Sequence, residues 1–300
     1  MAVVNVLNAR LLTAMVTPYD DELQVDYQKA RELASYLVRT GTEGIVVCGT
    51  TGESPTLTPE EKLRLFTAVK EEVGERAEVW AGTGSNFTRA TIELTQAASR
   101  TGVDGIMLVT PYYNKPSQDG LYEHFRKIAE AADLPVMLYN VPGRTGANLL
   151  PETVQRLSQV ENIVAIKEAS GNLDQVSQLR ILLPDDFVIY SGDDSLTLPM
   201  LAVGASGVVS IVSHIAGPEI RAMMESFFAG DVVRAAELHA KLFPLFKGLF
   251  ITTNPVPLKE ALNMMGTRVG GFRLPLTGAT DEEKLYIRQM LQQLGYLIKE

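Results

Sequence analysis

A lysine at the end of an apolar run is the strongest chemical signal in the sequence. Lys167 directly follows Ile163-Val164-Ala165-Ile166, and lysine is almost never fully buried without a partner. Because desolvation disfavours the ammonium, a lysine held there becomes a usable amine nucleophile. Such an amine can form a Schiff base with a carbonyl substrate. An ion pair with Glu168 at the strand end is an equally open alternative.

Three other run ends carry groups that this chemistry needs. Tyr139 ends the run 136–139, and its phenol can pass protons to and from a carbinolamine. Thr50 and Thr51 follow the run 44–48 and offer hydroxyls and backbone N–H groups for a carboxylate. Arg144 lies on a Pro-Gly turn, and its planar fork suits a carboxylate. The alternative for Tyr139 is a core aromatic, and for the two threonines a turn or helix-cap role. The alternative for Arg144 is a surface salt bridge.

Other reactive residue types are better explained by structure. We expect Tyr112 and Tyr113 to pack in the core or at an interface, and Cys48 to be a small core residue without a cation to activate it. Asp193 and Asp194 follow a glycine, a pattern more typical of helix caps than of metal ligands.

Eight short, nearly continuous apolar runs are typical of parallel strands covered on both faces. They span 11–16, 44–48, 79–81, 105–109, 136–139, 163–166, 187–190 and 207–212. Helix-period stretches separate them, at 27–39, 60–73, 88–99, 120–131, 151–158, 173–182 and 196–203. This alternation predicts an α/β fold, a (β/α)₈ TIM barrel, whose active site lies at the carboxyl ends of the strands. An open doubly wound sheet is disfavoured because Gly82-Thr83-Gly84 lacks a third glycine and indicates a tight turn.

The strand signal stops after about residue 218. Helices are expected at 218–228, 232–250, 257–265 and 281–299. We therefore expect a catalytic barrel over 1–230 and a C-terminal helical domain over 231–300. Capping boxes at Thr58 to Glu61, with Pro59 at the first helical position, and at Thr280 to Glu283 predict two of the helix starts.

The composition excludes several classes of protein. The 300 residues are 46% hydrophobic and carry a formal net charge of -9, which argues against a nucleic-acid binder or a polybasic membrane anchor. One cysteine fits a reducing cytosol, and three histidines without ligand spacing argue against zinc. The N-terminus does not resemble a signal peptide, and no apolar run is long enough to span a bilayer.

Five strings carry a family resemblance. The sequence contains GTTGESPT at 49–56, TPYYNKP at 110–116, YNVPGRTG at 139–146, IKEASGN at 166–172 and TTNPVPLKEAL at 252–262. Together they resemble the dihydrodipicolinate synthase (4-hydroxy-tetrahydrodipicolinate synthase) family, pyruvate-dependent class I aldolases that include N-acetylneuraminate lyase. The resemblance covers nearly the whole chain, with the motifs in the family's order.

The resemblance implies a mechanism. Lys167 would form an imine with pyruvate, whose carboxylate is held at Thr50 and Thr51. Loss of a methyl proton would give an enamine that attacks aspartate-4-semialdehyde, and the product would cyclise and leave by transimination. Tyr139 would shuttle protons through Thr50 and through Tyr113, which in the family reaches in from the neighbouring subunit. The other residues implied are Arg144, as anchor of the semialdehyde carboxylate, with Gly192 and Val209 lining the pyruvate pocket.

Two features favour the synthase, in lysine and diaminopimelate biosynthesis, over the sugar-acid lyases of the family. The string Gly49-Thr50-Thr51 has threonine where sialic acid lyases usually have serine, and Arg144 stands where those lyases usually lack arginine. A short acidic aldehyde needs a cationic anchor, whereas a polyol needs neutral hydrogen-bonding groups. The alternatives are N-acetylneuraminate or 2-keto-3-deoxy sugar acid cleavage, and a pyruvate-binding regulator without turnover.

The resemblance also bears on regulation and assembly. Lysine-inhibited members carry a glutamate, and often a histidine or tryptophan, beside Asn86 and Tyr112, whereas the matching positions here hold Pro59, Lys62 and Ala90. We therefore expect weak or absent feedback by lysine. The family implies a homo-oligomer, commonly a tetramer of two tight dimers. We expect a cytoplasmic enzyme with no cofactor, no metal, and no nucleic-acid or membrane partner.

Overall fold

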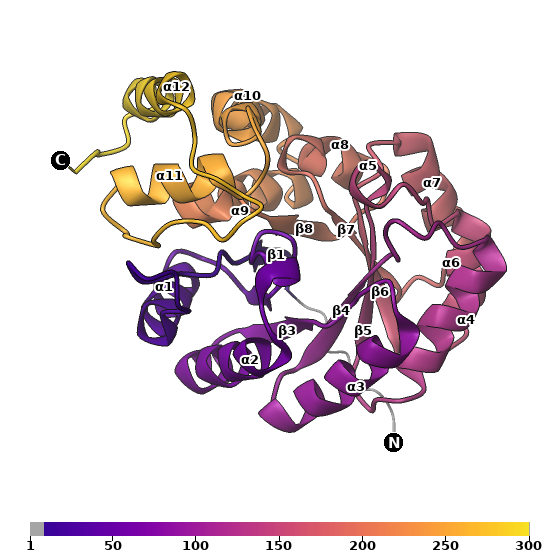
Figure 1. Ribbon diagram of the computed structural model, residues 1–300. Coiled ribbons are helices and arrows are strands. Elements are labelled where there is room, and N and C mark those ends of the chain that lie inside the picture. Colours follow the sequence, from indigo (N-terminus) through magenta and orange to yellow (C-terminus); the bar gives the residue numbers. More distant parts are fainter. Residues whose placement is uncertain (1–8, 300) are drawn as a thin grey trace.

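Eight parallel strands close into a barrel in the computed structural model, which describes residues 9–299 (Figure 1). Each strand pairs with its two neighbours in chain order, and β8 closes the barrel on β1. The strands are β1 Leu11–Ala14, β2 Gly44–Val47, β3 Glu78–Gly82, β4 Gly105–Val109, β5 Val136–Asn140, β6 Ile163–Glu168, β7 Val188–Ser191 and β8 Gly207–Ser210. All eight lie within two residues of the predicted runs at either end, so the TIM-barrel prediction is confirmed.

Helices surround the barrel in the predicted order. They are α1 Tyr27–Arg39, α2 Pro59–Val73, α3 Thr88–Ala98, α4 Gln118–Ala129, α6 Pro151–Leu157, α7 Leu173–Leu182, α8 Thr197–Ala202 and α9 Ser213–Phe228. The sequence did not predict the short helix α5 (Pro142–Thr145), nor the single 3₁₀ turns η1 (Ser54–Thr56), η2 (Ser99–Thr101) and η3 (Asp194–Leu196). Both predicted capping boxes are present. Strand and helix positions therefore follow from local patterning, and the loop turns do not.

Two predicted helix bounds are wrong for identifiable reasons. The helix α9 begins at Ser213 rather than at Pro218, because a kink at Ala216 (φ −124°, ψ 38°) joins a short first segment to the one that the proline starts. The helix α12 (Asp281–Gln293) ends before the expected 299, since Gly295 adopts φ +80°. A glycine in that conformation ends a helix.

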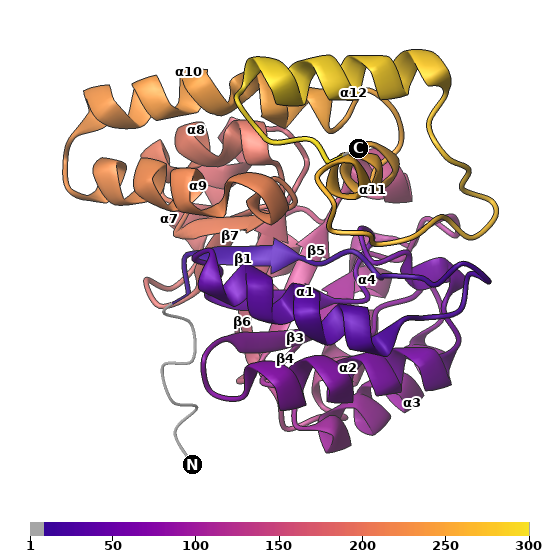
Figure 2. The same ribbon diagram turned by 90° about the vertical axis from the view of Figure 1, so that its left-hand side faces the viewer.

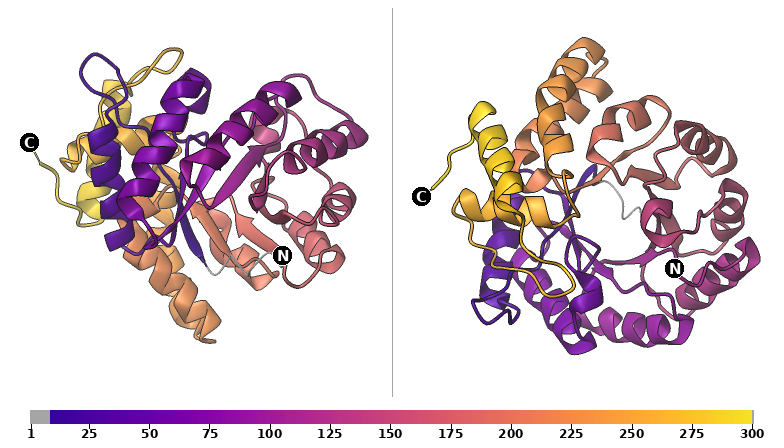
Figure 3. Two further views of the ribbon diagram at one scale, coloured as in Figure 1. Left: turned by 90° about the horizontal axis from the view of Figure 1, so that it is seen from below. Right: turned by 45° about the horizontal axis from the view of Figure 1, so that its top comes forward.

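The C-terminal helices pack against one side of the barrel. Figure 2 shows α10 (Val232–Gly248) and α12 forming a layer outside α9 and α11 (Val256–Met264). Viewed from other sides, the same helices remain beside the barrel and do not enclose it (Figure 3). The boundary expected at 230/231 falls in the loop between α9 and α10. The division into two domains remains a prediction.

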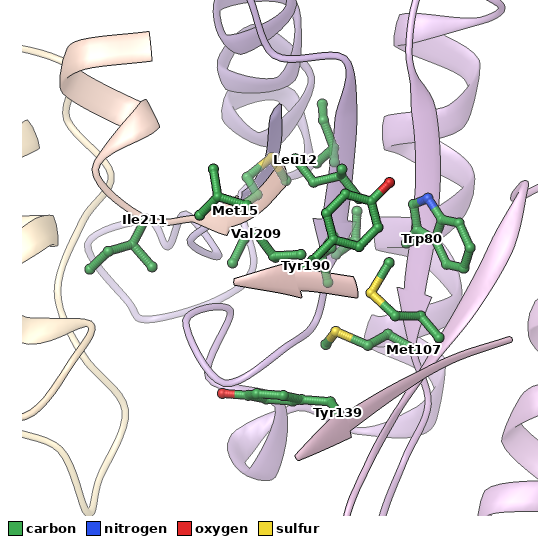
Figure 4. Packing of buried hydrophobic residues seen from close by; sticks show 14 of the residues in the cluster. Leu12, Met15, Trp80, Met107, Tyr139, Tyr190, Val209 and Ile211 are labelled. Carbon is green, nitrogen blue, oxygen red and sulfur yellow. The ribbon is translucent and has the colours of Figure 1, made fainter. Parts of the chain in front are cut away.

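Large side chains fill the barrel interior. Figure 4 shows Trp80, Met107, Tyr190 and Val209, from four different strands, within this core. Gly105 is required beside the indole, because a Cβ there would lie 2.5 Å from two of the Trp80 ring carbons. The barrel is thus a packed core that supports a site at one end rather than an open pore. No helix of the described chain combines the length and apolarity needed to cross a bilayer. The expectation about a signal peptide rests partly on residues 1–8, outside the described residues.

A buried histidine gives folding a defined pH dependence. His214 joins two strand ends, since its Nδ1 donates to the Ile211 carbonyl (2.8 Å) and its Nε2 accepts from the Val16 N–H (3.2 Å). Burial lowers the pKa of His214 to about 4. Because the unfolded chain then binds a proton that the folded chain does not, the imidazole's contribution to stability is complete above about pH 6.5 and is lost towards pH 4.

We expect this loss to approach about 3 kcal/mol of unfolding free energy. Urea unfolding at pH 7 and at pH 4.5 measures it, with His214→Gln as the comparison because glutamine retains a donor and an acceptor. The variant should lose less stability than the parent over this interval. Equal losses would show that His214 is not held neutral.

Candidate active site

Lys167 and Tyr139 meet at the carboxyl ends of neighbouring strands. The β5–β6 register pairs these two residues, so their side chains project from the same face of the sheet. The Lys167 Nζ lies 4.3 Å from the centre of the Tyr139 ring, and both residues are only 5% exposed. The fold therefore buries an amine against a phenol, as Schiff-base chemistry requires.

The alternative role of Lys167, an ion pair with Glu168, is not what the structure shows. The Glu168 carboxylate accepts hydrogen bonds from Asn140 Nδ2 (2.9 Å), Gln175 Nε2 (3.0 Å) and the Ser170 N–H (2.6 Å). No described residue forms an ion pair with Lys167. Glu168 thus ties the end of β6 to its surroundings, and the Lys167 amine is left for other partners.

Gly192, a residue that the resemblance places in the pocket, lies against the lysine stem. A Cβ at Gly192 would stand 3.2 Å from Lys167 Cε and 2.7 Å from the Ala169 Cβ. Any larger residue would displace the lysine side chain or the end of β6. The glycine therefore leaves room for the extended Lys167 side chain.

A cavity of about 290 Å³ opens beside Tyr139, and Lys167 lies behind that ring, outside the lining. The cavity brings together three of the predicted residues: Thr50 after β2, Tyr139 at the end of β5 and Arg144 on α5. The rest of its lining is Cys48, Gly49, Ser54, Pro55, Lys62, Gly82, Gly84, Ser85, Met107, Val109, Tyr112, Val141 and Thr145. Its charged lining residues are cationic, which suits an anionic ligand.

Cys48 is inert in this lining. Burial raises the pKa of its thiol to about 12, and the opposing charge of Lys62 does not reverse this. A thiol with so high a pKa is protonated at neutral pH and is a poor nucleophile. The prediction of a core residue is confirmed, although a cation does lie nearby.

Thr51 lies deeper than Thr50 in the same turn. The turn is closed by the Gly52 N–H to the Gly49 carbonyl (3.1 Å) and the Glu53 N–H to the Thr50 carbonyl (3.0 Å). Thr51 is 3% exposed, and its Oγ1 accepts a hydrogen bond from Asn254 Nδ2 at 3.0 Å. The turn therefore presents the two threonines to different surroundings, Thr50 to the cavity and Thr51 to the C-terminal segment.

Five of the predicted residues are not among the cavity lining residues: Lys167, Thr51 and Gly192, described above, and Tyr113 and Val209. Tyr113 has φ +74° and a side chain that is 89% exposed, although its N–H binds the Thr145 carbonyl (3.3 Å) next to the cavity. Val209 is buried in β8, in register with Leu12. The cavity of one chain thus holds neither Tyr113 nor Val209 in its wall.

The paired aspartates have structural roles. Asp193 Oδ1 accepts the Ser195 N–H and caps the turn η3, as the sequence predicted. The cap prediction is wrong for Asp194, which is buried and binds the Ser210 hydroxyl and the Ile211 N–H at the end of β8. The described residues contain no group of three or more metal-ligating side chains of the His, Cys, Asp and Glu types.

The sequence reading missed two buried residues of the C-terminal segment, Asn254 and Lys259. Lys259 is 0% exposed, and its Nζ binds Glu53 Oε1 (3.0 Å) and the Thr17 carbonyl (3.1 Å). A signal was present, because Lys259 occupies the same helical stripe as Leu258 and Leu262. A charged residue in an apolar stripe indicates a buried polar contact.

The fold and the paired lysine and tyrosine define a class of barrel suited to imine formation, and comparison with known proteins identifies the family. Residues 7–294 match the sequence profile of the dihydrodipicolinate synthetase family. A curated relative, the 4-hydroxy-tetrahydrodipicolinate synthase of Desulforudis audaxviator, is 61% identical over 96% of this chain and 98% of its own. The chain belongs to the dihydrodipicolinate synthetase family.

Solved structures agree with this assignment. The dihydrodipicolinate synthase of Bacillus anthracis is 50% identical, with a TM-score of 0.93 over 95% of this chain and 97% of its own. The enzyme of Cyanidioschyzon merolae, solved with lysine bound, is 48% identical, with a TM-score of 0.95 over 96% and 98% of the two chains.

Proposed function

We propose that this protein is a 4-hydroxy-tetrahydrodipicolinate synthase, a lyase that condenses pyruvate with L-aspartate-4-semialdehyde in the diaminopimelate route to lysine. The observation that carries the proposal is the buried Lys167 Nζ, 4.3 Å from the Tyr139 ring beside the cavity. The synthase named among the relatives, at 61% identity over nearly the full length, supports the choice of reaction.

The proposed reaction begins with imine formation. The Lys167 amine attacks the keto carbon of pyruvate, and the resulting carbinolamine loses water. Tyr139, next to the amine, supplies a proton to the departing hydroxyl and takes protons back in later steps. No external cofactor is required, because the protonated imine itself withdraws the electrons that loss of a methyl proton leaves behind.

Carbon–carbon bond formation follows. The enamine carbon attacks the aldehyde of the semialdehyde, and the aldehyde oxygen takes up a proton. The amino group of the adduct then displaces the Lys167 nitrogen from the imine carbon, which closes the ring and regenerates the free lysine. Thr50 and Thr51 hold the pyruvyl carboxylate, and the cationic wall of the cavity accepts the second carboxylate at Arg144. Gly192 and Val209 complete the surroundings of the pyruvyl group in this proposal.

The proton relay requires a second copy of the chain. Tyr113 is 89% exposed in the single chain, yet its backbone is bonded to the cavity wall at Thr145. We propose that the partner subunit's Tyr113 reaches the Tyr139–Thr50 pair across a dimer interface, with two such dimers forming a tetramer. Sedimentation measures the assembly. The free, buried Cys48 is in keeping with a reducing, cytoplasmic compartment.

A coupled assay tests the proposed function. The purified protein is given pyruvate and aspartate-4-semialdehyde, and separately N-acetylneuraminate and 2-keto-3-deoxy sugar acids. Turnover of the first pair alone supports the synthase. Cleavage of a sugar acid without condensation would assign a lyase of the same family.

Arg144→Ala separates the two substrates. Because a charged hydrogen-bonding pair is worth about 1.5–3 kcal/mol, kcat/KM for the semialdehyde should fall by about 10- to 100-fold. Imine formation with pyruvate should be retained, since Arg144 is assigned to the other carboxylate. Steady-state kinetics and borohydride trapping measure the two steps, with the exposed Arg234→Ala as control. Equal loss of both steps would contradict the assigned role.

Lysine should inhibit this protein weakly or not at all. The cavity lining that includes Ser85 and Tyr112 also includes Lys62, and no aspartate or glutamate is among the described residues that line the cavity. The ammonium groups of a lysine ligand would meet a like charge there and find no anionic partner. Initial rates with and without millimolar lysine measure this, and strong inhibition would refute it.

A further inference from the structure

The segment that enters α11 reaches the turn after β2 from the far end of the chain. Asn254 is 6% exposed, and its Nδ2 lies 3.0 Å from Thr51 Oγ1, a contact between residues 203 positions apart. Figures 1 and 2 place α11 between α12 and α1. The C-terminal segment is therefore one wall of the turn that holds the two threonines.

Buried charges fix this segment in place. The Lys259 Nζ on α11 bonds both Glu53, at the end of the threonine turn, and the Thr17 carbonyl after β1. Glu53 itself has a left-handed backbone (φ +54°) and a side chain sealed from solvent. The segment that carries Asn254 therefore contacts the threonine turn at two points, through Asn254 and, five residues further along the chain, through Lys259.

The hydrogen-bond chemistry gives this contact a direction. A threonine hydroxyl has one hydrogen to donate and two lone pairs to accept with. The Asn254 amide donates into one of the Thr51 lone pairs, so the Thr51 hydrogen is free for another acceptor. No described residue accepts that hydrogen, and the Asn254 Oδ1 is itself buried without a donor. A carboxylate is an acceptor-only group and would accept the free Thr51 hydrogen.

We propose that Asn254 is a positioning residue that turns the Thr51 hydroxyl into a hydrogen-bond donor for the carboxylate of the keto acid. The inference rests on the proposed function and extends it, because it assigns a substrate-orienting role to the C-terminal segment. Asn254 acts through Thr51 and does not itself touch the reacting atoms.

Asn254→Asp is the sharpest test. An aspartate of the same shape can only accept, so it would capture the Thr51 hydrogen and add a negative charge next to the incoming carboxylate. We expect the KM for pyruvate to rise about 10- to 100-fold, the loss typical of a charged hydrogen bond, with a much smaller change in kcat. Asn254→Ala removes the amide without capturing the hydrogen, and its rise in KM should be smaller.

Two controls separate this role from a structural one. Asn172→Asp adds the same charge after β6 and retains its cap on α7, where the side chain accepts the Asp174 and Gln175 N–H groups; its KM should match the parent. In a Thr51→Val background, Asn254→Ala should have no further effect on KM. Thermal unfolding of every variant shows whether it is folded. If Asn254→Asp does not fold, the KM of Asn254→Ala for pyruvate is the test.

The pyruvate dependence of borohydride trapping at Lys167 is the readout that keeps the two proposals apart. If the parent traps no pyruvate, the proposed function fails. If the parent traps pyruvate and the Asn254 variants trap it with the parental half-saturation, the role of Asn254 fails and the proposed function stands. A fall in kcat and in thermal stability at constant KM would likewise assign Asn254 to structure alone. Two results together support the inference. The Asn254 variants need more pyruvate for half-maximal trapping than the parent, and the rise in KM caused by Asn254→Ala disappears in the Thr51→Val background.

Discussion

Lys167→Arg is expected to reduce kcat by at least about 1000-fold, because the loss of a covalent nucleophile removes the main reaction path. Arginine retains a long side chain next to Tyr139, but its guanidinium is not deprotonated in proteins and forms no imine. The variant therefore removes the nucleophile and keeps a long, nitrogen-bearing side chain in its place. Turnover of pyruvate with the semialdehyde measures the effect.

A matched substitution makes this result specific. Lys247→Arg makes the same change at an exposed position in the last turn of α10, outside the cavity lining, and should retain parental kcat. Both variants should unfold at temperatures close to that of the parent. Residual activity of Lys167→Arg within tenfold of the parent would contradict a Schiff base at this residue.

Lys259→Met should cost about 3–5 kcal/mol of unfolding free energy, the effect of breaking a buried ion pair from one side. The substitution leaves the Glu53 carboxylate buried, and among the described residues only the Arg273 N–H, at 3.4 Å, remains as a donor to it. It also removes the ammonium from the face of Tyr19, 4.3 Å from the ring centre. Urea or guanidinium unfolding at pH 7 measures the change.

The double variant tests the cause. Adding Glu53→Gln to Lys259→Met removes the unpaired charge, and a large part of the lost stability should return, since apolar or neutral replacements of a buried pair are often tolerated. Lys29→Met, which breaks an exposed pair with Glu32, should change stability by less than about 1 kcal/mol. A Lys259→Met protein as stable as the parent would show that the pair does not anchor the C-terminal segment.

Local patterns in the sequence were enough to predict the barrel. Parallel strands that are covered on both faces are apolar at nearly every position, and this marked the strands that the structure confirms. The rule that barrel sites lie at the carboxyl ends of the strands also predicts that Thr50, Tyr139 and Lys167 lie at one end of the barrel. The two misplaced helix bounds arise where a kink or a left-handed glycine overrides helical periodicity.

The remaining features depend on contacts that local patterns do not encode. The choice between a free Lys167 and an ion pair with Glu168 depends on Asn140 and Gln175, which satisfy that carboxylate from other elements. The contact of Asn254 with Thr51 joins residues about 200 positions apart. Sequence periodicity reports on single elements, so these long-range pairings appear only when the barrel closes and the C-terminal segment packs on it.

Trapping with borohydride in the presence of pyruvate tests the central proposal most directly. Reduction of the imine converts it to a stable secondary amine, and peptide mass spectrometry then locates the modified residue. We predict a single pyruvyl adduct on Lys167, formed only when pyruvate and borohydride are both present and absent from Lys167→Arg. An unmodified Lys167 in a folded protein, or an adduct on a different lysine, would contradict the proposed mechanism.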